Sequence, residues 1–141
     1  MIAVQLNQLE LMEGWHEEDP ANHWRAQFPT LGMSEMESLG TVYFELEPGQ
    51  ELGSHTDSQD EIVVLLSGSG EGTVGDETAH LAAHGMVFIP AMVPHGFRNT
   101  GDETLRAFGI FAGAEVVSTF QRDVMPMGTR VFDSRELSAI G

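Results

Sequence analysis

Short apolar segments separated by glycine and proline are the feature that most constrains the fold of this chain. Among 141 residues there are 16 glycines and 6 prolines, and from residue 40 onward they end each apolar segment after a few positions. None of these segments reaches the roughly 18 residues that a membrane-spanning helix requires. Glycine and proline at this density are typical of short strands joined by turns. The sequence therefore predicts an antiparallel all-β domain with one core.

The expected strands follow one another at intervals of roughly 8–12 residues, which is the spacing of a β-sandwich or barrel. Two turns are especially clear, because Pro48-Gly49 ends one apolar segment and Gly75-Asp76 divides another into a hairpin. The segments that we expect to contain strands are 41–47, 61–70, 71–81, 86–90 and 95–113.

The two ends of the chain carry weaker patterns. We expect residues 1–6 to form an edge strand. Residues 13–30 are polar, aromatic and bounded by proline, so we expect a loop or a short helical turn there. Residues 114–124 fit either a short helix or a last strand, and the remaining tail has no clear pattern. No repeat or linker divides the chain, so a single domain is expected.

The chain is strongly acidic, with a net charge of −16 at pH 7, and all 6 basic residues are arginine. Such a surface repels nucleic acids and anionic lipids, so neither nucleic acid nor a membrane is an expected partner. Cysteine is absent, which excludes disulfides and thiolate chemistry. Because the first residues also lack the pattern of a signal peptide, we expect a cytoplasmic location.

Three polar residues, His55, Asp57 and Glu61, directly precede an apolar strand. In an extended segment residues two apart share a face, so His55 and Asp57 point the same way and Glu61 keeps this parity. Val63 and Leu65 continue that face, which places the polar group at one end of an apolar cavity. Two carboxylates buried together are costly unless a positive charge offsets them. Since no arginine lies nearby in sequence, a divalent cation is expected, and Fe, Mn, Ni, Co and Zn all suit these ligands.

A further ligand is expected from another strand. His95 lies between Pro94 and Gly96, in a rigid turn that leads into an expected strand. Such a turn is a good place from which to direct a side chain into a pocket. The other histidines are expected at the surface, namely His16, His23, His80 and His84.

These segments resemble the two sequence motifs of the cupin superfamily. The positions that match the first motif, G-x5-H-x-H-x3/4-E-x6-G, are Gly49, His55, Glu61 and Gly68, with Asp57 in place of the second histidine. The positions that match the second motif, G-x5-P-x-G-x2-H-x3-N, are Pro90, His95 and Asn99, with His84 and Met92 at its two glycine positions. The resemblance covers about residues 40–112.

The resemblance implies a single-domain, antiparallel double-stranded β-helix, or jelly roll, with the cupin barrel in residues 40–113. Residues 1–39 are then an N-terminal extension that packs on the barrel or on a dimer partner. Residues 114–141 are a C-terminal strand or helix with a tail.

The resemblance also implies one divalent transition metal at the motif positions, here His55, Asp57, Glu61 and His95. The aspartate makes the ligand set more anionic and harder, which favours Fe or Mn over Cu, with Zn and Ni also suitable. The same residues further resemble the facial triad of two histidines and one carboxylate in Fe(II) oxygenases. In that arrangement His55, Asp57 and His95 are the ligands, and Glu61 is an outer partner or the catalytic base.

The implied function is that of a metal-dependent enzyme on a small-molecule substrate, with a dioxygenase-type oxidoreductase favoured and Glu61 as the catalytic residue. Two alternatives stay open: a redox-neutral isomerase, lyase or cyclase, and a non-catalytic barrel that binds a small ligand. The expected pocket residues are Tyr43, Phe97 and Arg106, the last for an anionic substrate. A homodimer is expected because single-barrel cupins commonly pair and an edge strand needs a partner.

Overall fold

The computed structural model describes residues 1–136 of the chain. Twelve strands form one continuous sheet, preceded by a single turn of 3-10 helix, η1 (Leu6–Gln8). The strands are β1 (Met12–His16), β2 (Asp19–Gln27), β3 (Gly40–Leu46), β4 (Glu51–Asp57), β5 (Glu61–Ser67), β6 (Ser69–Val74), β7 (Glu77–Ala82), β8 (Met86–Ile89), β9 (His95–Asn99), β10 (Leu105–Phe111), β11 (Val117–Val124) and β12 (Thr129–Asp133). Within the described residues, no helix has the length and apolar character needed to cross a membrane.

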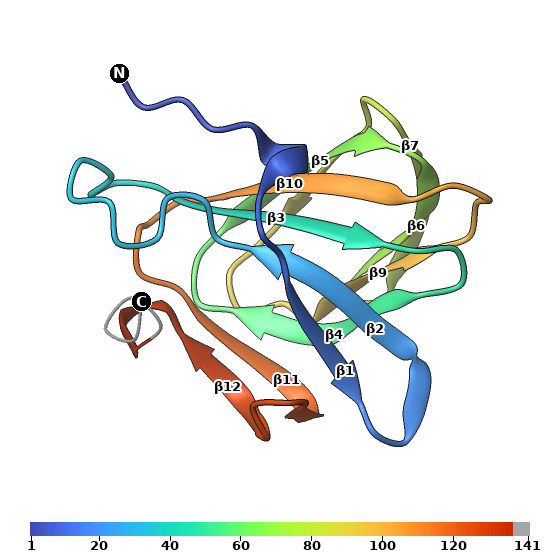
Figure 1. Ribbon diagram of the computed structural model, residues 1–141. Helices are drawn as coiled ribbons and strands as arrows, with labels where there is room; N and C mark the ends of the chain where they lie inside the picture. Colours follow the sequence, from blue (N-terminus) through green and yellow to red (C-terminus); the bar gives the residue numbers. More distant parts are fainter. Residues whose placement is uncertain (137–141) are drawn as a thin grey trace.

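The sheet closes into a barrel of two facing layers (Figure 1). One layer has the order β3-β10-β5-β8 and the other the order β4-β9-β6-β7, with antiparallel neighbours throughout. Strand β2 links the layers, because it pairs antiparallel with β3 and meets β4 at one parallel pair, Asn22 with Glu51. This is the antiparallel barrel that the strand pattern predicts, with the jelly-roll arrangement that the resemblance to cupins implies.

Strand alternation fills the barrel with apolar side chains. In β5, Val63 and Leu65 are buried, whereas Ile62 and Leu66 are exposed on the outer face. Burying a side chain of this size stabilises the fold by roughly 1.5–3 kcal/mol. The buried members of the core are Trp24, Ala26, Phe44, Leu46, Val63, Leu65, Ile89, Phe97, Leu105, Ala107, Phe120 and Val124.

Two motif glycines serve the turns rather than the site. Gly49 and Gly68 have φ angles of +83° and +79°, a left-handed conformation that glycine adopts at little cost. A Cβ atom at Gly68 would also lie 2.8 Å from the carbonyl oxygen of Thr104. Glycine at these positions therefore allows the tight entry into β4 and the turn between β5 and β6.

The N-terminal region differs from the loop that the sequence predicts, because residues 12–27 form the hairpin β1–β2. In β2 the buried residues Asn22, Trp24 and Ala26 alternate with more exposed ones. Because Asn22 is polar although buried, the alternation of apolar and polar residues that indicates a strand is hard to see in the sequence. Residues 1–5 form no strand, so the expected edge strand is absent from this structure. The homodimer stays a prediction.

The C-terminal region adds a second hairpin, β11–β12 (Figure 1). Of the two alternatives for residues 114–124, the strand is correct, since β11 pairs antiparallel with β4. The tail, which has no clear sequence pattern, supplies β12. The pairing of β11 with β4 places this late segment directly beside the polar residues of the first motif.

Candidate metal centre

The four expected ligands gather at one end of the barrel interior. His55 and Asp57 alternate along β4 and therefore share its inner face. Strands β4 and β9 pair so that His55 stands directly opposite His95. Glu61 is the first residue of β5, just after the short turn that follows Asp57. All four side chains are buried, with at most 8% of any residue exposed.

The side chains converge on one carboxylate oxygen, Oδ2 of Asp57. Nε2 of His95 lies 3.0 Å from this oxygen, and Nε2 of His55 lies 3.6 Å from it. Glu61 approaches from the side, with Oε1 3.6 Å from Nε2 of His95. One ligand atom from each of His55, Asp57 and His95 lies within 4.8 Å of the other two. These distances are short enough for one ion to contact all three residues.

The hydrogen bonds of the two imidazoles fix which ring nitrogen faces the centre. Nδ1 of His55 lies 2.8 Å from the carbonyl oxygen of Gly53, and Nδ1 of His95 lies 3.0 Å from that of Val93. A carbonyl only accepts, so each Nδ1 donates its proton there. In a neutral ring Nε2 then presents a lone pair to the centre, as a metal ligand requires.

The Oδ2 atom of Asp57 is buried and has no hydrogen-bond partner of good geometry. A proton on Nε2 of His95 satisfies one contact to Oδ2 of Asp57. The lone pair on Nε2 of His55 is then left without a partner. A divalent cation between the three atoms satisfies all of them. The residues therefore fit a bound metal, through a preformed set of two nitrogens and a carboxylate with Glu61 beside it.

Burial and mutual charge shift the pKa values of these groups in different directions. Burial lowers the pKa of His55 to about 4, which keeps this imidazole neutral. Burial also disfavours charge on His95, but its close contacts with the carboxylates of Asp57 and Glu61 outweigh this effect and raise its pKa to about 10. Burial raises the pKa of Glu61 to about 7. Burial opposes charge on Asp57 too, yet contact with the histidines holds its pKa below the usual range.

Strand β11 supplies two residues that support the site and that sequence reasoning missed. The hydroxyl of Ser118 donates a 2.5 Å hydrogen bond to Oδ1 of Asp57, which orients the carboxylate. The ring of Phe120 stacks on His55 at a centroid distance of 4.7 Å, and Trp24 stacks on Phe120 at 6.0 Å. No short motif joins these residues to the ligands, because β11 lies more than sixty positions further along the chain.

Gly109 in β10 is a third missed residue. A Cβ atom at this position would collide with the carboxylate of Glu61 and come within 2.8 Å of Val42. The absence of a side chain therefore gives Glu61 its place in the barrel. The segment around Gly109 is an apolar strand in the sequence, and an isolated glycine there is the one available signal of close approach.

The donors open onto a cavity of about 100 Å³. Its walls are mostly aromatic or aliphatic, and Phe97 is one of the residues that line it. Besides the four donors and Ser118, the lining residues are Met12, Trp24, Ala26, Phe28, Val42, Phe44, Leu52, Phe97, Phe111, Phe120, Met127 and Phe132.

Tyr43 and Arg106 are placed outside this cavity, contrary to the expectation from sequence. In β3 the residues Val42 and Phe44 face the interior, so Tyr43 between them faces the other side. Arg106 likewise alternates with the buried Leu105 and Ala107 of β10. Both side chains contact Glu45 on the outer face of the layer.

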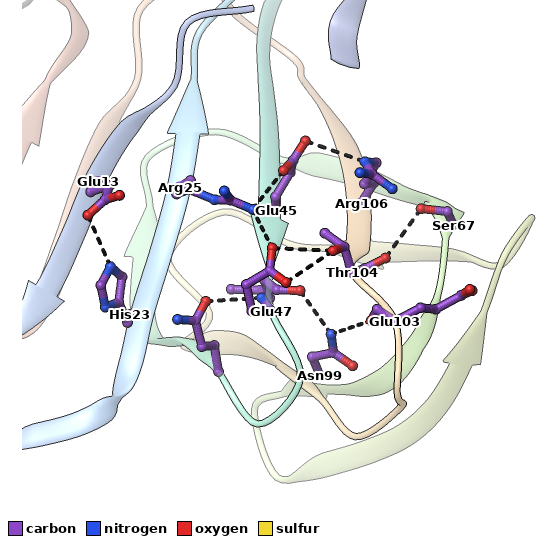
Figure 2. A network of polar contacts seen from close by, with 12 residues as sticks. Glu13, His23, Arg25, Glu45, Glu47, Ser67, Asn99, Glu103, Thr104 and Arg106 are labelled. Atoms are coloured by element: carbon purple, nitrogen blue, oxygen red, sulfur yellow. Dashed lines mark hydrogen bonds and ion pairs between the residues drawn. The ribbon is translucent and has the colours of Figure 1, made fainter. Parts of the chain in front are cut away.

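That outer face carries a network of paired charges (Figure 2). Glu45 accepts hydrogen bonds from Tyr43 at 2.6 Å and from Arg25 at 2.9 Å, and its carboxylate lies 3.4 Å from Nε of Arg106. Arg25 also binds Glu47. We refer to Arg25, Tyr43, Glu45, Glu47 and Arg106 as the outer network.

The other histidines lie away from the donors. His80 and His84 are exposed, as expected. His23 is partly buried and pairs with Glu13, 3.3 Å away. His16 is buried rather than exposed, because it belongs to β1 and its Nδ1 bonds the carbonyl oxygen of Asp123 at 2.8 Å.

Comparison with known proteins gives a family and a fold. Residues 42–111 match the family model described as the cupin domain. An uncharacterized protein of Streptomyces coelicolor is 32% identical over 78 residues, which are 55% of this chain and 73% of that protein.

Two solved structures illustrate the range of proteins that share the fold. One is a candidate sugar phosphate isomerase from Acidithiobacillus ferrooxidans, with a TM-score of 0.65 and 22% identity over 85% of this chain and 79% of the other. The second is the salicylate 1,2-dioxygenase of Pseudaminobacter salicylatoxidans, with a TM-score of 0.57 and 21% identity over 63% of this chain and 26% of the other.

Proposed function

The chain belongs to the cupin superfamily, and we propose that it is a metal-dependent enzyme acting on a small molecule, of the mononuclear non-haem dioxygenase type. One observation carries this proposal. Two imidazole nitrogens and a buried carboxylate oxygen meet at the end of an apolar cavity, and a proton on His95 contacts only one of the other two donors, whereas a divalent cation binds all three.

His55, Asp57 and His95 are the proposed metal ligands, and Fe or Mn is the favoured ion because a hard carboxylate joins the two nitrogens. When bound, such an ion supplies Lewis acidity and one-electron chemistry. Ser118 holds the Asp57 carboxylate, and Phe120 holds the His55 ring, so the ligands keep their positions before the metal arrives.

Glu61 is the proposed proton acceptor. Its Oε1 atom lies 3.6 Å from His95, next to the ligands but outside the three-residue group. Burial raises its pKa to about 7, a value suited to taking a proton from a substrate and returning it. The aromatic walls exclude water from this proton transfer and strengthen the electrostatic interactions within the cavity.

The same acceptor supports a second candidate, a redox-neutral isomerase, lyase or cyclase. In that reaction Glu61 moves a proton between two positions of the substrate, and no electron transfer is required. A solved structure of a candidate sugar phosphate isomerase shares the fold. The cavity also suits a non-catalytic role in ligand binding.

Metal content of protein purified without a histidine tag tests the proposal. We expect near-stoichiometric Fe or Mn in the wild type and none in the double variant His55→Ala/His95→Ala. Oxygen consumption with a panel of small substrates then separates the two enzyme classes. Zn or Ni without oxygen use favours the redox-neutral reaction. Absence of any metal, even after reconstitution, contradicts both and leaves a ligand-binding barrel.

A further inference from the structure

We propose that this cavity selects an uncharged, largely apolar ligand, about the size of a substituted six-membered ring, and rejects anions. The inference rests on the proposed function, since it names the class of substrate that the same site accepts. Three independent features of the chain support it: the composition of the wall, the charge of the donor set and the charge of the whole protein.

The wall provides no cation for an anionic ligand. Among the described residues that line the cavity there is neither lysine nor arginine. Arg25 and Arg106 lie on the outer face of the layer, where both contact Glu45. Arg135 lines a separate pocket of about 220 Å³ that shares Phe28, Phe111, Ser118 and Phe132 with the cavity, but its guanidinium holds Asp133 with two hydrogen bonds. A carboxylate or phosphate in the cavity would therefore be desolvated without a lysine or arginine to offset its charge.

The donor set leaves no excess positive charge. Asp57 and Glu61 contribute two carboxylates, and the two imidazoles are neutral as ligands. Together with a divalent ion, these groups sum to zero. A histidine at position 57 would leave one positive charge to attract an anion, so the aspartate removes the main electrostatic reason for an anion to enter.

The net negative charge of the whole chain also disfavours anionic ligands, and it acts over a longer range than the donor set. With 22 acidic and 6 basic residues, the protein repels anions before they reach the cavity. Inside the cavity, the aromatic and aliphatic side chains of the wall, Trp24 and Phe120 among them, offer apolar surface to a ring or a short aliphatic group. The volume of about 100 Å³ is of the same order as, but smaller than, the roughly 150 Å³ of a cavity that encloses benzene, which limits the enclosed part of a ligand to one small ring.

Nitrobenzene and benzoate test the inference, because they have nearly the same shape and differ in charge. We expect nitrobenzene to bind at least about tenfold more tightly than benzoate, in the metal-loaded and in the metal-free protein, by titration calorimetry. Added salt should leave the affinity for nitrobenzene unchanged and should improve the weak binding of benzoate by screening the acidic chain.

Two variants locate the bound probe. In Trp15→Phe, Trp24 is the one remaining tryptophan of the chain, and nitrobenzene should quench its fluorescence with the affinity found by calorimetry. Phe132→Ala changes the cavity wall and should alter this affinity. The matched change Phe88→Ala removes a ring that is 55% exposed on the outer face and should not alter it.

Benzoate affinity equal to or above that of nitrobenzene, in either form of the protein, overturns the inference. So does a failure of nitrobenzene to bind up to its solubility limit, or equal effects of the two phenylalanine variants. Metal content is measured on the same samples. If no metal binds, the proposed function fails, and the ratio of the two affinities in the metal-free protein still decides the ligand class.

Discussion

The candidate metal centre and the outer network are two polar clusters on opposite sides of the barrel wall, and they balance charge in different ways. In the outer network, the carboxylates of Glu45 and Glu47 contact the guanidinium groups of Arg25 and Arg106 (Figure 2). In the metal centre, two buried carboxylates face two imidazoles and no arginine. The first cluster pairs carboxylates with permanently charged guanidinium groups, whereas the second pairs them with imidazoles whose charge depends on a proton.

This difference shows why burial of charge alone does not identify a functional site. Glu45 is as buried as His55, at 8% exposed for each residue. Its partners are fixed side chains of β2, β3 and β10, so it stabilises the packing of those strands. Asp57 has a buried oxygen without a partner beside a cavity. Nε of Arg106 in the outer network also lacks a hydrogen bond, so what distinguishes Asp57 is that its oxygen meets two imidazole nitrogens beside a cavity.

The largest effect should follow from loss of a histidine ligand. His95→Ala removes the nitrogen nearest to Asp57 and should weaken metal binding by more than the roughly 10- to 100-fold that loss of an outer partner costs. Metal titration followed by calorimetry measures this. His80→Ala, at an exposed position of β7, is the control and should bind metal as the wild type does. Retention of metal by the His95 variant would contradict the proposed ligand set.

A smaller effect is expected from Ser118→Ala. Without its hydroxyl, Oδ1 of Asp57 loses its 2.5 Å hydrogen bond and the carboxylate is free to rotate. Metal affinity should fall by roughly 10- to 100-fold while the stoichiometry stays at one. Thr119→Ala, one position along the same strand, tests whether any change in β11 has this effect. Equal losses in both variants would argue against a specific role for Ser118.

In the outer network, Glu45→Gln should lower the free energy of unfolding and leave metal binding unchanged. The change weakens the contacts of Glu45 with two arginines and Tyr43, at a cost of roughly 1–3 kcal/mol, reduced because Arg25 and Arg106 are partly exposed. Urea unfolding measures the loss. Glu47→Gln, at a position whose side chain is 44% exposed, should cost less. A change in metal affinity would mean that the two clusters are coupled.

The smallest effect concerns the pH dependence of stability through Tyr43. Burial, followed by the hydrogen bond to Glu45, raises the pKa of this phenol above its usual value of about 10. A raised pKa in the folded state gives stability that is present below pH about 10 and is lost as the pH rises further. Unfolding by urea at increasing alkaline pH should therefore weaken the wild type more steeply than Tyr43→Phe. Parallel curves would show that Tyr43 does not ionise on unfolding.

Much of the fold and of the candidate ligand set could be predicted from the sequence, because both depend on local rules. Alternating apolar residues and glycine turns predict the barrel strands from residue 40 onward. The separation of two between His55 and Asp57 places them on one face whenever the segment is extended. His95 follows from the second motif. These inferences need only the geometry of a strand and its turns.

Some features depend on the pairing of distant segments, and only the tertiary structure decided these. The assignment of Tyr43 and Arg106 to the outer face required knowing which side of β3 and β10 closes the barrel, since alternation gives two faces but does not say which is inside. Ser118 reaches Asp57 only because β11 pairs with β4, and Glu61 has room only because Gly109 lies against it. Contacts of this kind arise from strand register across long separations, which no local pattern of residues encodes.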